Sequence, residues 1–138
     1  MRRNWLAFIY MLKGMVLLYN GQEFSCAHRP SLFEREAIQP RRDGDIGALL
    51  SRLYLIRRTA LPVGGSSSLR HAGNGVIVLE RYDGCACLAG VFNTRGVPCA
   101  VRCGLPDGRY QNLIDDRAVR VEGGLMASDG EPVIFAVD

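Results

Sequence analysis

The chain has 138 residues and a formal net charge of +3, from 17 basic and 14 acidic residues. This length suits one ordinary domain or two very small ones. A hydrophobic fraction of 48% supports a packed core and argues against wholesale disorder. Because the charge is mild and the basic residues are spread along the chain, we expect no nucleic-acid partner.

Residues 2–13 carry apolar side chains at helical spacing and predict a helix that ends at Gly14. Further apolar residues widen this face until it nearly surrounds the helix, which must then be buried on most sides. The positions i, i+3, i+4 and i+7 are held by Trp5, Phe8, Ile9 and Leu12.

A signal peptide or membrane anchor is the alternative for this N-terminal stretch, because two arginines precede the apolar run. Lys13 and Gly14 interrupt that run, and its length of about fifteen residues is short of the ~20 that span a bilayer. We therefore favour a buried helix and expect no membrane partner.

The run Met15–Asn20 is apolar on both faces and predicts a central parallel strand covered on both sides. A polar cluster that includes Gln22 and Glu23 follows it. In parallel α/β folds, ligand chemistry lies at the carboxyl ends of the strands.

Residues 21–42 form a long connection, which is expected to be functional or docked. Asp43 or Asp45 is predicted to cap a second helix. Arg57 and Arg58 lie in its last turn, where cations complement the helix dipole, and Leu61-Pro62 ends it. Its predicted apolar face consists of Ile46, Leu49, Leu50, Leu53 and Tyr54.

After Gly64–Ser68, which we interpret as a flexible joint, the apolar period changes to two. Strands are predicted at 75–82, 85–93, 97–103, 109–114, 117–121 and 132–137, with a further candidate at 124–127. Short strands separated by Gly and Asp turns predict an antiparallel β-sandwich. The predicted fold class is α+β: N-terminal helices with one barrel-type strand (residues 1–63), followed by a sandwich of about seven strands (residues 64–138).

Five cysteines cannot all be paired within one chain. Cys85, Cys87, Cys99 and Cys103 fall on two neighbouring predicted strands, and their spacing is unusual for zinc. We expect buried free thiols and no metal site. Free thiols favour a reducing compartment and a cytoplasmic location.

Three stretches resemble the α-amylase family of glycoside hydrolases. KGMVLLYNGQE, residues 13–23, is similar to the eighth barrel strand, P-G-x-P-x-x-Y-x-G-x-E, with Lys13 and Val16 in place of its two prolines. Residues 49–62 resemble the last barrel helix, and residues 64–138 resemble the small β-domain that follows the barrel. The resemblance implies the C-terminal portion of such an enzyme, a fragment that begins just before the eighth strand.

In that family the catalytic carboxylates follow the fourth, fifth and seventh strands, and no position here matches those motifs. We therefore expect no catalytic residue, metal or cofactor in this chain. The resemblance implies an α-glucan or oligosaccharide partner and makes Gln22 and Glu23 candidate substrate-binding residues. The alternative for both is bonding to nearby backbone, which anchors the loop.

The other candidate residues do not form a catalytic pattern. His28 and His71 have no nucleophile at a useful spacing. Asp115 and Asp116 indicate a turn between strands. Four aromatic residues would form a sugar-stacking platform if they were exposed together, or would otherwise lie in the core: Tyr19, Tyr82, Phe92 and Tyr110.

A barrel closes only with eight strands, so residues 1–63 cannot keep that fold alone. We expect residues 5–19 to be buried by repacking onto the β-domain or by a second copy, which would make a homo-oligomer through exposed N-terminal segments.

The predicted function is a barrel-completing, non-catalytic part of an enzyme that hydrolyses or transfers α-glucosidic bonds in carbohydrate metabolism. The alternative is a stand-alone β-sandwich module for carbohydrate binding or assembly.

Overall fold

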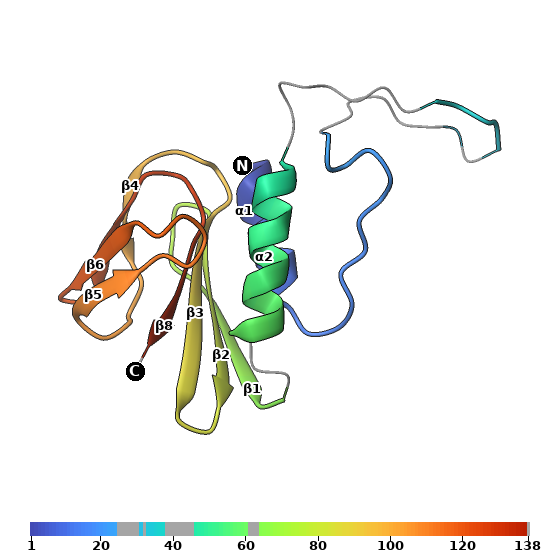
Figure 1. The fold of residues 1–138 in the computed structure, drawn as a ribbon. Coiled ribbons are helices and arrows are strands. Elements are labelled where there is room, and N and C mark those ends of the chain that lie inside the picture. The colour runs from blue at the N-terminus through green and yellow to red at the C-terminus, as the bar shows by residue number, and fades with distance from the viewer. Residues whose placement is uncertain (25–30, 32, 38–45, 61–63, 138) are drawn as a thin grey trace.

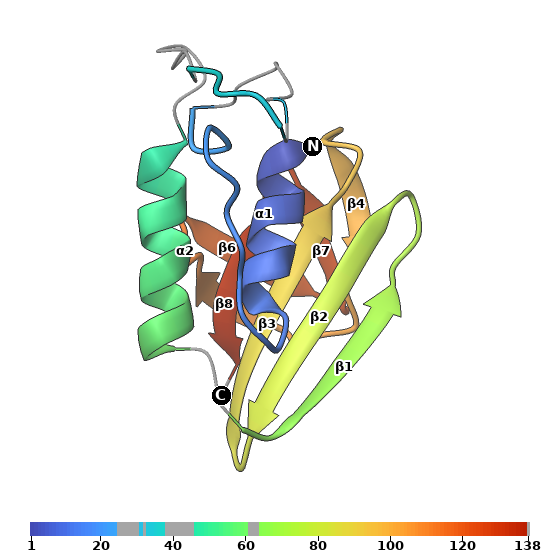
Figure 2. The ribbon, with the colours of Figure 1, turned by 90° about the vertical axis from the view of Figure 1, so that its right-hand side faces the viewer.

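The computed structural model describes residues 1–24, 31, 33–37, 46–60 and 64–137. Two helices, α1 (Arg2–Met11) and α2 (Gly47–Thr59), cover one face of a four-stranded sheet. A second four-stranded sheet lies against the other face of the first, so the chain forms three layers (Figures 1 and 2).

All paired strands are antiparallel. The first sheet has the order β1 (Ser66–His71), β2 (Val76–Asp83), β3 (Ala86–Asn93) and β8 (Val133–Val137). The second has the order β4 (Cys99–Arg102), β7 (Leu125–Ser128), β6 (Ala118–Glu122) and β5 (Gly108–Gln111). The predicted α+β class with a β-sandwich is confirmed.

The seven predicted strands are all present, and the structure adds one that the sequence did not predict. Strand β1 occupies Ser66–His71, so the prediction of a flexible joint over Gly64–Ser68 is wrong for its serines. His71 ends this strand. The serine-rich strand forms because its backbone pairs along the length of β2, from Ser66 opposite Tyr82 to His71 opposite Ile77.

Two apolar cores hold the layers together. The helix-side core lies between the helices and the first sheet and includes Met11, Leu53 and Phe92. The inter-sheet core includes Val78 and Phe135. The helices thus pack on the sandwich and share a core with it. The division at residues 63 and 64 stays a prediction, and residues 61–63 lie outside the described part.

The buried face of α2 differs from the prediction at one position. Four of the five predicted residues are buried, but Tyr54 is 58% exposed and Ile56 is buried in its place. The buried residues follow the helical repeat from Leu49 through Leu53 to Ile56, and Tyr54 points away from that stripe. The helix begins after Ile46 without a side-chain cap, and Asp43 and Asp45 lie outside the described residues.

The predicted strand at Met15–Asn20 is wrong for this chain: the segment is not assigned as a strand, and no strand in the described part pairs with it. A strand needs a hydrogen-bonded neighbour, and each described strand pairs only with other strands of its own sheet. Packing on the sandwich buries Ala7, Tyr10 and Met11 of α1 but leaves Trp5 43% and Ile9 42% exposed, so the predicted buried face of this helix is wrong for those two residues. It leaves Met15 100% and Leu17 85% exposed, so burial within the chain is wrong there. Cover by a second copy stays a prediction.

Among the described helices, none has the length and apolar content needed to span a membrane.

Candidate functional site

Residues 12–24, the connecting segment, leave the end of α1 and run back beside the helices (Figure 2). Arg57 of α2 fixes the start of the segment. Its guanidinium donates to the carbonyl oxygens of Tyr10 (2.5 Å), Leu12 (2.8 Å) and Gly14. The last carbonyls of a helix lack partners within the helix, so this arginine stabilises the end of α1.

The far end of the connecting segment is a tight turn that holds both predicted site residues. Gln22 Oε1 accepts from the Tyr19 amide (2.9 Å), and Glu23 Oε2 accepts from the Gly21 amide (2.9 Å). The Glu23 carbonyl also accepts from the Ile46 amide (3.0 Å), which ties the turn to the start of α2. Both side chains therefore anchor the loop, and sugar contact by either stays a prediction.

Between these two anchors the connecting segment is extended and apolar. Of its central residues, only Val16 packs against the helix-side core. Met15, Leu17, Leu18 and Tyr19 are all exposed large apolar residues, and α1 and α2 expose others, including Trp5, Ile9, Tyr54 and Leu55. Large exposed apolar side chains that gather into one patch are uncommon on monomeric proteins, so these residues are candidates for an interaction surface.

A buried amide network fixes α1 on the sandwich. Asn4 is fully buried; its Nδ2 donates to the Gly130 carbonyl (2.8 Å) and its Oδ1 accepts from the Asn93 amide (2.8 Å). Asn93 Nδ2 in turn donates to the Val97 carbonyl (2.7 Å) and to Ser128 Oγ (3.3 Å). This role of Asn4 was not predicted from the sequence. The available signal was its spacing from Ala7 and Met11, which places it on the buried face.

The carboxylates near the β5–β6 connection have structural partners. The Asp116 amide donates to the Asn112 carbonyl (2.8 Å), which confirms the predicted turn. Arg52 of α2 donates to Asp116 Oδ1 (2.7 Å). Arg117 forms ion pairs with both Asp115 and Asp129. Its hydrogen bond to Asp129 lowers the pKa of the Asp129 carboxyl. Within the described residues, no group of three or more His, Cys, Asp and Glu side chains could hold a metal; His28 lies outside them.

The four aromatic residues do not form a common platform. Phe92 is buried and packs edge-on against Phe8, with ring centroids 5.6 Å apart. Tyr110 stacks on Phe135 of the inter-sheet core at 4.6 Å. The Tyr82 hydroxyl donates to Glu80 (2.8 Å), which raises its pKa to about 12. The sugar-stacking interpretation is therefore wrong for Phe92 and Tyr110, which pack in different cores.

The described cysteines are free thiols. Cys103 is buried as predicted, but Cys85 is exposed and Cys87 and Cys99 are half-buried. Cys87 and Cys99 lie on strands of different sheets, although their strands are consecutive in the sequence. Burial raises the pKa of the Cys87 thiol, which makes it less reactive.

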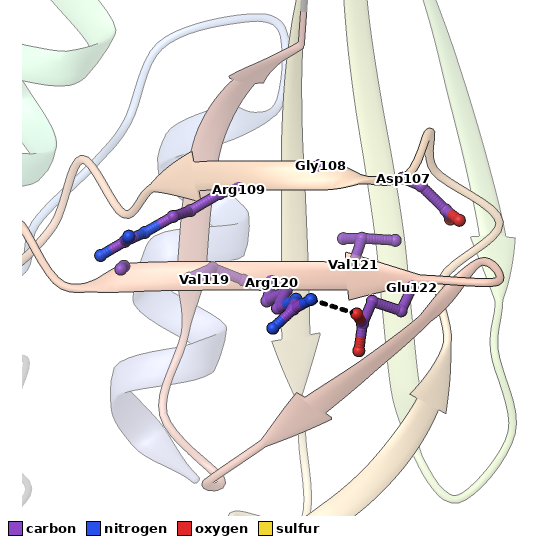
Figure 3. Close-up of a pocket in the computed structure, with 8 residues that line it drawn as sticks. Asp107, Gly108, Arg109, Val119, Arg120, Val121 and Glu122 are labelled. Carbon is purple, nitrogen blue, oxygen red and sulfur yellow. Dashed lines mark ion pairs between the residues drawn. The ribbon is translucent and has the colours of Figure 1, made fainter.

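An open groove of about 770 Å³ lies over β5 and β6, and its lining includes Asp107, Arg109, Arg120 and Glu122 (Figure 3). Asp107 accepts from the Gly123 (2.9 Å) and Gly124 (3.0 Å) amides, which lower its pKa. Arg120 forms an ion pair with Glu122 (2.5 Å). These residues were not predicted as a site from the sequence; the available signal was the alternation of charged residues along a predicted strand.

Comparison with known proteins gives two kinds of match. Residues 68–135 match the family described as bacterial α-amylase C-terminal domain. The structure of the chain also resembles solved structures of α-amylases over nearly its whole length. No curated protein matches it.

An α-amylase from Lactobacillus plantarum is 32% identical with a TM-score of 0.88, and the match covers 99% of this chain and 33% of that one. A maltogenic α-amylase from Thermotoga neapolitana is 22% identical with a TM-score of 0.78, and the match covers 98% of this chain and 36% of that one. At this identity the match shows a shared fold only. The chain thus spans about a third of the length of these proteins.

Proposed function

Because this chain is the C-terminal part of an α-amylase-family protein, we propose that it completes and braces the barrel of a glycoside hydrolase without supplying the catalytic groups. The whole protein would hydrolyse or transfer α-glucosidic bonds in an α-glucan or oligosaccharide. In a retaining enzyme this chemistry needs two carboxylates on either side of the scissile bond. We assign those carboxylates to the two thirds of the relatives' length that this chain does not span.

One observation carries the proposal: the connecting segment has the character of a barrel strand but lacks its neighbours. It is extended, is held at one end by Arg57 and at the other by the turn at Glu23, and exposes Met15 and Leu17. Its apolar side chains suit a strand that is covered on both faces. Two further parallel strands would satisfy its backbone and cover these side chains.

The turn that contains Gln22 and Glu23 would then lie at the carboxyl end of this strand. Ligand chemistry in barrels is placed at that end. In the whole protein these two side chains would border the substrate cleft, held in position by their bonds to the Tyr19 and Gly21 amides. We further propose a division into a barrel end, residues 1–63, and a sandwich, residues 64–138, in a cytoplasmic protein.

A chimeric enzyme tests the proposal. This chain replaces the C-terminal third of the Lactobacillus plantarum α-amylase, and release of reducing sugar from maltodextrin is measured. The chimera should be active and the isolated chain inactive. Replacing residues 15–19 with a glycine-serine linker should abolish the activity, whereas the matched change Leu69→Ser, at an exposed position of β1, should preserve it.

Two results would contradict the proposal. Hydrolysis of maltodextrin by the isolated chain would show that it carries its own catalytic groups. Full activity of the chimera with the linker would show that residues 15–19 do not complete the barrel.

Self-association of the isolated chain is a second candidate, favoured by the exposure of Met15, Leu17 and Tyr19. A second copy would cover these side chains and form a homo-oligomer, as an assembly module would. Sedimentation velocity at several concentrations measures this association. A monomer up to ~100 μM, a concentration at which even weak contacts with micromolar affinity associate, would exclude it.

A further inference from the structure

The solvent face of the β5–β6 hairpin places two arginines directly opposite each other. Arg109 and Arg120 are partners in the antiparallel register, and both side chains are exposed. Opposite residues on one face of such a pair have Cβ atoms about 4.5–5.5 Å apart, and like charges there destabilise the pairing. The hairpin therefore bears a local electrostatic cost.

Only one of these two charges has a counterion in the described part of the chain. Arg120 is turned toward Glu122 and forms an ion pair with it (2.5 Å), whereas Arg109 forms no ion pair and extends away from Arg120 (Figure 3). Asp107, the other acid of the groove, already accepts two backbone amides, from Gly123 and Gly124. The two guanidinium groups have turned apart, as like charges do without an anion between them.

The groove offers space for a ligand at this point. Ala118, on the same strand face as Arg109 and Arg120, has only a methyl group and leaves the surface beside the arginines open. Strands β6 and β7 pair only through Val121 and Glu122, and a second hollow of about 330 Å³ lies next to the separated ends of these strands. Both hollows are lined by Ala118, Val119 and Arg120, so Arg120 stands where they meet.

We propose that this groove, the β5–β6 groove, binds an oxyanion group of a ligand, a phosphate or a carboxylate, between Arg109 and Arg120. The guanidinium fork matches both groups through paired hydrogen bonds. A bound anion would remove the repulsion between the two arginines and would compete with Glu122 for Arg120. The site lies on the sandwich and is independent of the barrel-completing role.

Amide NMR spectra of the full chain test the site by titration with inorganic phosphate and, separately, with acetate at constant ionic strength. We expect saturable shifts at Arg109, Ala118 and Arg120. Arg109→Gln and Arg120→Gln should each weaken binding by about tenfold, because charge-assisted hydrogen bonds are the strong ones. The matched change Arg58→Gln, at an exposed position in the last turn of α2, should leave the affinity unchanged.

The variant Glu122→Gln gives the most decisive test. If the ion pair were purely structural, this variant would bind anions no more tightly than the original chain. Removal of the competing carboxylate should tighten anion binding severalfold and leave the fold intact, since the pair is exposed on both sides. Tighter binding of phosphate or of acetate identifies the group that the site prefers.

Three results would overturn the proposal: no saturable shift with either anion, equal weakening by Arg58→Gln, or unchanged affinity in Glu122→Gln.

Discussion

Replacing Asn4 with alanine should strongly destabilise the chain, because it removes the buried link between α1 and the sandwich. The Asn4 amide bonds two backbone groups, the Gly130 carbonyl and the Asn93 amide, both at 2.8 Å. The variant leaves both groups without this partner in a buried environment. It also removes the bonds through which the helix is oriented on β3 and on the turn before β8.

The magnitude follows from the cost of unsatisfied buried groups. Each buried donor or acceptor that loses its partner costs about 1–3 kcal/mol, which gives about 2–6 kcal/mol for the pair. Alanine is a better helix former than asparagine, and this offsets up to about 0.7 kcal/mol. The net loss is therefore expected to be about 1–5 kcal/mol, a large part of the stability of a small protein.

Equilibrium unfolding in urea measures this loss. Fluorescence of Trp5, the only tryptophan, reports on α1, and far-ultraviolet circular dichroism reports on the whole chain. The matched control is Arg3→Ala, which removes an exposed ion pair from the same turn of α1 to Glu131 (2.7 Å). Exposed pairs contribute about 0–1 kcal/mol, so this control should lose little stability.

Equal losses of the free energy of unfolding in Asn4→Ala and Arg3→Ala, with an unchanged slope against urea, would refute this prediction. That result would mean that water replaces both hydrogen bonds of Asn4 without cost. It would also mean that apolar contacts alone hold α1 on the sheet.

Two further predictions concern the turn before β8 and its surroundings. Gly130→Ala should cost at least about 2 kcal/mol, because Gly130 has φ 95° and an added Cβ would lie 2.6 Å from the Gly96 carbonyl oxygen. Gly123→Ala, also at positive φ but with open space around it, should cost only about 1 kcal/mol, and equal losses in urea unfolding would refute the steric argument. The hydrogen bond from Arg117 keeps the pKa of the Asp129 carboxyl below its ordinary value. A lowered folded pKa stabilises the chain above the unfolded pKa, and this contribution disappears as the pH falls through the folded pKa. In Arg117→Gln the pKa of Asp129 measured by NMR should therefore rise and less stability should be lost on acidification; an unchanged pKa would contradict the assigned cause.

Local sequence patterns determined where the elements lie. The period of two and the glycine turns placed β2, β3 and β8 within a residue or two of their observed bounds, and helical spacing placed α1 and α2. These patterns are readable because the side chains of one element face one core, which leaves a periodic trace in the chain. The apolar run at Met15–Tyr19 also predicts, without a structure, that this segment requires cover on both faces.

Only the tertiary structure decided which segments meet. Ser66–His71 has no apolar pattern and becomes a strand because β2 offers it a hydrogen-bonding edge. Asn4 is a buried link only because it meets two backbone groups that are distant in the sequence. These are the amide of Asn93, 89 residues away, and the carbonyl of Gly130, 126 residues away. Likewise, the pairing of Arg109 with Arg120 depends on the register of two strands.

The connecting segment shows most clearly what the sequence alone does not determine. Its composition defines the surroundings that it requires, but a strand forms only when a neighbouring backbone completes its hydrogen bonds. In this chain that neighbour is not among the described strands, so Met15 and Leu17 remain in solvent. Side-chain spacing determines what a segment can become, and long-range pairing determines what it does become.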